Sequence, residues 1–202
     1  MKYQANGPWT GSKSAAFDGS SYLQLPPLNL GILSADNGFS VCVWYLYIAL
    51  NSWSRIIDFG IGKGHNNCFP AILETTSQLV LNAHDGTTSY QTPLPIYVTL
   101  NQWSHICVTN KQSTTNVYDN SQLVFTSTSM VFNNVLLTSN YMGKSNWAVD
   151  GLLNGRLDEL CIYNVELSFT QVSELYNARP VTGCLSRSFH NFMSHIFIFR
   201  IK

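Results

Sequence analysis

Apolar and polar residues alternate along most of the chain in short runs that are rich in β-branched and aromatic side chains. Alternation with a period of two residues predicts strands that bury one face and expose the other. Asp18-Gly19, Asn37-Gly38, Asp85-Gly86 and Asn154-Gly155 separate these runs and favour tight turns. We therefore expect an all-β chain of about ten or more strands, including segments 39–45, 55–59, 78–82, 103–109, 116–118, 123–126 and 157–163.

One segment near the end of the chain has a helical pattern instead. Ser168 can cap a helix, and Gln171 three residues later completes the signature of a capping box. Val172 and its apolar neighbours recur at helical spacing, and Pro180 would stop further growth. The sequence thus predicts one short helix over 168–178.

The chain has the length of one sizeable domain, with 202 residues of which 45% are hydrophobic. Residues 1–180 show no solenoid repeat and no Pro/Ser linker, so we expect one domain made of two stacked sheets. Residues 181–202 differ, because the apolar, β-prone run at 196–201 has no matching partner in the pattern. We interpret 181–202 as an atypical tail, either an extra edge strand or sequence foreign to the domain.

Charge excludes several classes of partner. Only 11% of the residues are charged, and eleven Lys and Arg balance eleven Asp and Glu. Without a net positive field, we expect no binding to nucleic acid. No apolar run reaches the roughly 18 residues that span a bilayer, so we expect no membrane insertion. Residues 1–13 lack the apolar segment of a secretory signal, so we expect either a fragment of a longer protein or a chain that is not exported.

Catalysis is not expected from the distribution of carboxylates. A glycosidase needs two of them about 5 to 10 Å apart around the scissile bond. Only Asp158 and Glu159 are adjacent in the sequence, and neighbours on a strand point to opposite faces. A hydrolase would therefore require convergence in an open cleft lined by aromatics of two among Asp58, Glu74, Asp85, Asp150 and Glu159.

Several loop residues have the chemistry that recognises sugars. An aromatic face can stack on the apolar side of a sugar ring, while amides and carboxylates bind its hydroxyl groups. Trp147 combines both features because it lies between Asn146 and Asp150, although such a tryptophan can also close the end of a sandwich. The candidate ligand-binding residues are Trp147, Asn146, Asp150, Asn66, Asn67 and Tyr90.

Six segments read in order carry a family resemblance. Segments 15–25, 39–47, 53–60, 101–110, 141–147 and 154–180 resemble the laminin-G-like jelly roll of the concanavalin A-like lectin/glucanase superfamily, and the resemblance covers about residues 13–180. The most specific segment is the last, NGRLDELCIYNVELSFTQVSELYNARP. The resemblance implies an all-β, two-sheet antiparallel jelly-roll sandwich.

The same resemblance implies a function. We expect a non-catalytic recognition module that binds carbohydrate or an extracellular protein, as part of a larger extracellular protein. The superfamily also contains enzymes and adhesion domains, because one fold hosts many functions. A glucanase-like hydrolase and a purely structural or adhesive spacer are therefore the alternatives, and a spacer would bind nothing on a glycan array.

Pentraxins of the same superfamily suggest a disulfide. The segments FSVC and HIC resemble the strands that carry the single pentraxin disulfide, which implies a bond between Cys42 and Cys107. Cysteines in the middle of neighbouring strands can reach the Cα separation of about 5.5 to 6 Å that a disulfide requires. The alternative is two buried thiols packed side by side.

Calcium is the cofactor that the resemblance suggests. In the resembled fold the first strand pairs with the strand that holds Asp158, so Asp18 and Asp158 are candidate calcium ligands at one end of the sheets. Hydrogen bonding at a turn and at a strand end is the alternative role for them. Asn66 and Asn67 match the first ligands of the pentraxin calcium site, but residues 144–147 replace its acidic cluster, which argues against that type of binding.

Overall fold

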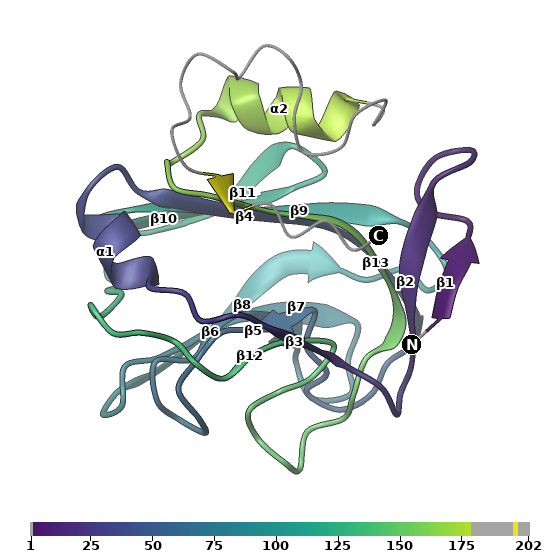
Figure 1. The fold of residues 1–202 in the computed structure, drawn as a ribbon, viewed down its shortest axis with the longest axis horizontal. Helices are drawn as coiled ribbons and strands as arrows, with labels where there is room; N and C mark the ends of the chain where they lie inside the picture. Colours follow the sequence, from purple (N-terminus) through teal and green to yellow (C-terminus); the bar gives the residue numbers. More distant parts are fainter. Residues whose placement is uncertain (1, 179–195, 198–202) are drawn as a thin grey trace.

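The computed structural model describes residues 2–178 and 196–197 as two stacked β-layers, drawn one above the other in Figure 1. All strand pairs are antiparallel, as expected for the two-sheet jelly-roll sandwich. The first layer has the strand order β1 (Lys2–Ala5), β2 (Lys13–Asp18), β13 (Asn154–Tyr163), β4 (Phe39–Ala49), β9 (Ser104–Lys111), β10 (Thr114–Asp119) and β11 (Gln122–Ser127).

The second layer consists of two short sheets that isolated bridges connect. One sheet has the order β3 (Leu23–Leu25), β12 (Asn140–Met142) and β5 (Ile57–Asp58), and the other has the order β6 (Cys68–Ile72), β7 (Gln78–His84) and β8 (Ser89–Tyr97). Bridges between Arg55 and Ala71 and between Phe59 and Cys68 join them. This connection places the segment after β5 next to β6, where the candidate site is found.

Strand β4 shows how the sequence fills both of its faces. Phe39, Val43 and Tyr47 belong to the main core between the layers. Cys42 and Trp44 point to the other face, which other elements cover. Because both faces are buried, the strand reads as a nearly continuous apolar run rather than a strict alternation. The structure joins Cys42 to Cys107 directly across β4 and β9, the pairing that the resemblance implied.

Helix α2 (Phe169–Asn177) covers the outer face of the first layer (Figure 1). Ser168 and Gln171 form the predicted capping box, which confirms the helix expected over 168–178. Tyr176 stacks on Trp44 with ring centroids 5.3 Å apart. Burial under this helix lowers the pKa of His105 to about 3, so the imidazole is neutral. The helix therefore covers this face around Trp44 and His105.

The strand and helix patterns missed several elements, among them one helix and one strand with two prolines. Helix α1 (Leu30–Ala35) lies at one end of the two layers, and its only local signal is Asn29, whose side chain caps Ile32 N–H. Strand β8 contains Pro93 and Pro95, which argue against a central strand. The structure places β8 at the end of its sheet order, where missing N–H donors are tolerated. The expectation of a single helix was thus wrong for the described residues.

The C-terminal segment contributes one short strand to the described structure. Strand β14 (Ile196–Phe197) pairs with Ile162 and Tyr163 of β13. The rest of the expected tail at 181–202 lies outside the described residues. Within the described part of the chain, no helix combines the length and the hydrophobicity needed to cross a bilayer.

Candidate functional site

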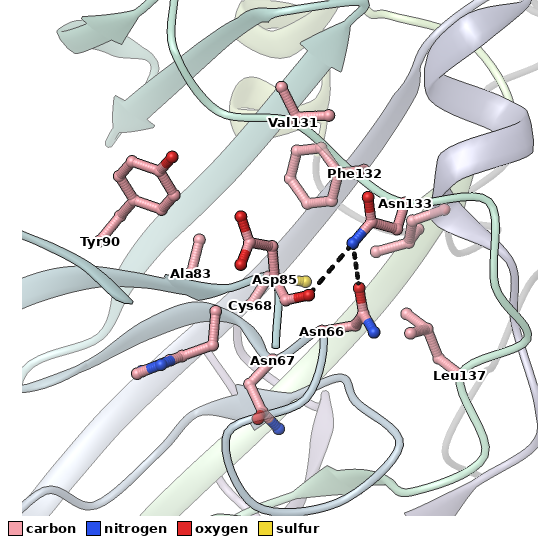
Figure 2. A pocket seen from close by; sticks show the side chains of 12 residues that line it. Asn66, Asn67, Cys68, Ala83, Asp85, Tyr90, Val131, Phe132, Asn133 and Leu137 are labelled. Atoms are coloured by element: carbon pink, nitrogen blue, oxygen red, sulfur yellow. Dashed lines mark hydrogen bonds between the residues drawn. The ribbon is translucent and has the colours of Figure 1, made fainter. Parts of the chain in front are cut away.

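Three connections meet at one place in the fold. They are the β5–β6 connection, the turn between β7 and β8, and the long connection from β11 to β12. The Asn133 Nδ2 atom donates to Asn66 Oδ1 over 2.7 Å and to the Asp85 carbonyl oxygen over 3.3 Å, so one amide links all three (Figure 2). Asn66 adopts φ of 54°, a left-handed conformation that asparagine tolerates better than most residues.

These connections enclose a pocket with about 360 Å³ of empty space, part of it open to solvent. The site is therefore a partly open surface hollow rather than an enclosed cavity. Its polar lining residues are Asn66, Asn67, His84, Asp85, Tyr90 and Asn133. Its apolar lining residues are Leu30, Cys68, Ala83, Val131, Phe132 and Leu137.

Asp85 offers a fixed, negatively charged acceptor at this pocket. Its Oδ1 atom accepts hydrogen bonds from the backbone N–H groups of Thr88 (2.7 Å) and Thr87 (2.9 Å). These bonds hold the pKa of the carboxyl below its ordinary value, so it is ionised at neutral pH. Figure 2 shows the carboxylate directed to the side where Tyr90 and Phe132 lie. Among the described residues no hydrogen bond or ion pair engages its Oδ2 atom.

Two aromatic rings complete the site. Tyr90, near the start of β8, is 37% exposed and can present its ring face to a ligand. Phe132 is half-buried, and its ring packs edge-on against Phe39 of the core at a centroid distance of 4.9 Å. Aromatic faces beside amide and carboxylate groups form the combination that can hold a polar ring with one apolar side.

Asn67 lines the pocket but turns its side chain away from Asp85 and Tyr90 (Figure 2). It is only 1% exposed, and its amide lies against Gly60, where an added Cβ would collide with the Asn67 Nδ2 atom. A side chain at position 60 would therefore require the buried Asn67 amide to shift. Asn67 forms a wall of the pocket rather than part of its rim.

A buried ionic network, which we call the Arg55 cluster, lies behind that wall. It consists of Arg55, Asp58, Ser145, Asn146 and Asp150. Arg55 pairs with both carboxylates at nitrogen to oxygen distances of 3.6 Å. The Ser145 hydroxyl donates to Asp150 (2.6 Å) and accepts from Arg55 Nε (3.1 Å). Asn146 donates to Asp58 through its backbone N–H (2.7 Å) and its side-chain amide (3.1 Å).

Burial dominates the chemistry of this cluster. The Asp58 side chain is 0% exposed and that of Asp150 is 9% exposed. Desolvation raises the pKa of Asp58 to about 6, although the Arg55 charge and the Asn146 hydrogen bonds oppose the shift. Two of the carboxylates considered for hydrolysis thus share one arginine, but they are buried and ion-paired. They do not form the open, aromatic-lined cleft that the hydrolase alternative requires.

Trp147 connects the Arg55 cluster to the pocket. Its ring covers the Arg55 guanidinium at 5.0 Å and contacts the His84 ring at 4.9 Å. His84 also lines the pocket. Desolvation, followed by the Arg55 charge, lowers the pKa of His84, so the imidazole is neutral at physiological pH. The tryptophan thus supports the pocket wall from behind.

The structure divides the six predicted ligand residues into two groups. Asn66, Asn67 and Tyr90 line the pocket, whereas Asn146 and Asp150 belong to the Arg55 cluster and Trp147 covers it. Sequence reasoning missed His84, Phe132 and Asn133. The two amides in VFNNV, which contains Phe132 and Asn133, indicate a loop and no particular function, and His84 has no local signal.

The two candidate calcium ligands are not brought together. Asp18 pairs with Asn154 in the β2–β13 ladder, and Asp158 lies four residues further along β13, about 13 Å away at ordinary strand rise. The exposed Asp18 carboxylate accepts from Ser20 and Ser21, and these bonds lower its pKa. Among the described residues no three His, Cys, Asp or Glu side chains cluster as metal ligands. This pair does not fit a calcium ion.

Comparison with known families gives one match that covers most of the chain. A sequence profile described as the concanavalin A-like lectin/glucanases superfamily matches residues 17–173. None of the curated protein sequences compared with the chain matches it.

Solved structures with similar folds include several carbohydrate-binding domains. Domain 4 of AbnA, a GH43 extracellular arabinanase from Geobacillus stearothermophilus in complex with arabinotriose, superposes with a TM-score of 0.69 at 24% identity and covers 87% of this chain and 80% of that one. The SAP-like pentraxin of Limulus polyphemus gives 0.56 at 18% identity, covering 80% of each chain. The CBM40 domain of Ruminococcus gnavus IT-sialidase, bound to α2,3-sialyllactose, gives 0.56 at 12% identity over 79% of this chain and 97% of that one. At these identities the likeness shows the fold alone.

Proposed function

Because the chain belongs to the concanavalin A-like lectin/glucanase superfamily, we propose that it is a carbohydrate-binding module that holds a glycan in the pocket between Asn66, Asp85, Tyr90 and Asn133. One observation carries the proposal. Three connections that are far apart in the sequence bring two amides and an ionised carboxylate around one pocket, beside the exposed phenol ring of Tyr90 on β8. These groups match the hydroxyl groups and the apolar face of a sugar ring.

The ligands of the structural neighbours support this choice of ligand class. Arabinotriose is bound in the arabinanase domain, and sialyllactose is bound in the sialidase CBM40 domain. The arabinanase neighbour is one domain of a larger extracellular enzyme, and we propose a similar setting for this chain. A protein ligand is less favoured, because the recognition groups gather around a small pocket rather than across a flat face.

Recognition without catalysis fits the carboxylates better than hydrolysis does. Asp85 is the single acidic side chain among the described residues that line the pocket. Glycoside hydrolysis requires a second carboxylate on the opposite side of the scissile bond. Asp58 and Asp150 cannot serve as this second group in the described conformation, because they are buried against Arg55.

A glycan array followed by calorimetry of the strongest glycan tests the proposal. Tyr90→Ala should weaken binding about tenfold, because it removes the ring face from the pocket. Tyr97→Ala is the matched control, since Tyr97 lies on the same strand, is 67% exposed and does not line the pocket. Failure of the unmodified protein to bind any glycan, or equal losses in the two variants, would overturn the proposal.

A further inference from the structure

The pocket has a polar rim and an apolar floor, and this contrast bears on which sugars fit. Asp85, Asn133 and Tyr90 contribute polar atoms at the solvent side. Four side chains that are at most 9% exposed contribute the floor, namely Leu30, Cys68, Ala83 and Leu137. Selectivity among sugars at this pocket rests on the proposed glycan-binding function and narrows the class of sugar that the pocket would bind.

A second cavity continues the apolar floor into the core. It is narrow and shares Leu30, Cys68 and Phe132 with the pocket. The rest of its lining is apolar except for Thr115, whose hydroxyl already accepts a hydrogen bond from Asn110 over 2.9 Å. The space beneath the pocket therefore offers little to satisfy a hydroxyl group.

This lining penalises one kind of substituent and favours another. A sugar hydroxyl that enters the floor loses its water partners and gains no hydrogen bond in return. A methyl group in the same place loses no hydrogen bond to water and gains van der Waals contact with Leu30, Ala83 and Leu137. The floor thus discriminates between sugars that differ only in a methyl-bearing group.

Charge adds a second criterion. Asp85 is the sole ionised side chain among the described residues that line the pocket, because the neighbouring His84 is neutral. An acidic sugar would place its carboxylate near that of Asp85 without a lysine or arginine in the lining to compensate. An uncharged sugar can instead donate a hydroxyl hydrogen to Asp85 Oδ2.

We propose that the pocket selects an uncharged sugar with a methyl-bearing substituent, an N-acetyl or a 6-deoxy group, and that the methyl group faces the apolar floor. The hydroxyl groups of the same sugar bind Asp85 and the amides at the rim. A buried methyl group should strengthen binding about fourfold relative to a sugar that lacks it.

Matched pairs of sugars test this selectivity in the unmodified protein. N-acetyl-D-glucosamine is compared with D-glucose, and L-fucose with D-arabinopyranose, which is the same ring without the methyl group. D-glucuronic acid compared with D-glucose tests the charge criterion. Competition against the strongest glycan of the array supplies the affinities. We expect at least one methyl-bearing sugar to compete about fourfold better than its partner, and the acid to compete less well than glucose.

A substitution in the floor shows whether the preference arises there. Ala83→Val fills part of the floor and should reduce the fourfold preference to less than twofold. Ala178→Val is the matched control at an exposed position after α2 and should leave the preference unchanged. The comparison of sugar pairs in the unmodified protein decides the question even if Ala83→Val fails to fold.

The outcomes separate this inference from the proposed function. Glycan binding without a preference for methyl-bearing sugars, or with a preference for the acid, would overturn the inference and leave the proposed function standing. A preference that persists unchanged in a folded Ala83→Val variant would also overturn it. Absence of binding to every glycan would overturn both.

Discussion

The pocket and the Arg55 cluster lie back to back, yet they use polar residues in opposite ways. Arg55, Asp58 and Asp150 are almost fully buried, and Arg55 forms an ion pair with each carboxylate. Asp85 and Asn133 lie at the surface, and Asp85 keeps one carboxylate oxygen for an external partner. Buried charges must be paired within the protein, whereas polar groups at an exposed rim can be hydrated until a ligand binds.

Proximity in the sequence is a poor guide to which polar loop residues form a binding site. Asn146, Trp147 and Asp150 are close in the sequence and look like a sugar site, but their loop folds over Arg55. Asn66 and Tyr90 look less suggestive because they are far apart in the sequence. The fold brings them to one pocket. The contrast between a structural cluster and a binding rim can be tested by substitutions on each side.

The largest expected effect is on stability, from Arg55→Ala. Removing the guanidinium leaves Asp58 and Asp150 buried without a cation, which typically costs about 3–5 kcal/mol. Urea unfolding measures the loss. Lys63→Ala is the control, because Lys63 is exposed in the β5–β6 connection, and it should change the free energy of unfolding by less than about 0.5 kcal/mol. Equal stability of the two variants would show that the cluster is not structural.

Asp58 should also make stability depend on pH. Its pKa is about 6 in the folded protein and about 3.9 in an unfolded chain, so the folded state holds the proton more tightly. The contribution of Asp58 to stability is therefore greatest below pH 4 and decreases as the pH rises to about 6.

The Asp58→Asn variant isolates this titration. The free energy of unfolding of the unmodified protein, minus that of Asp58→Asn, should fall by roughly 2–3 kcal/mol between pH 4 and pH 7. Urea unfolding of both proteins at a series of pH values measures the difference. A difference that stays constant, or rises with pH, would contradict the raised pKa.

The smallest expected effect is on the other side of the comparison. Asp85→Asn preserves an oxygen for the turn formed with Thr87 and Thr88 but removes the charge, so we expect glycan binding to weaken about fivefold to tenfold. Calorimetry measures the affinity, and thermal unfolding should remain close to that of the unmodified protein. Asp36→Asn, at an exposed position after α1, is the control. If Asp85→Asn bound the glycan with full affinity, the Asp85 carboxylate would not contribute to glycan binding.

Much of the fold could be predicted because its signals are local. The apolar, β-branched and aromatic runs of β4, β9 and β13 and the capping box at Ser168 act within a few residues. Helix α1 and strand β8 could not be predicted in the same way. Tertiary packing of Leu30 stabilises the helix, and the position of β8 at the end of its sheet order tolerates two prolines that a pattern rule rejects.

The site was only half predictable for a related reason. Residue chemistry marked Asn66, Asn67 and Tyr90, but the partners that complete the pocket come from loops with no distinctive pattern. Asn133 reaches Asn66 across 67 positions of sequence. The separation of Asp18 from Asp158 likewise depends on strand register, which a resemblance alone does not determine.

Amide chemical shifts during titration with the strongest glycan of the array show whether the glycan binds in the pocket. If it does, the largest changes in chemical shift should occur at Asn66, Asp85, Tyr90 and Asn133. The chemical shift of the Tyr97 amide should not change. Changes concentrated on the outer face over α2 or around Tyr97, with the pocket amides unmoved, would contradict the account.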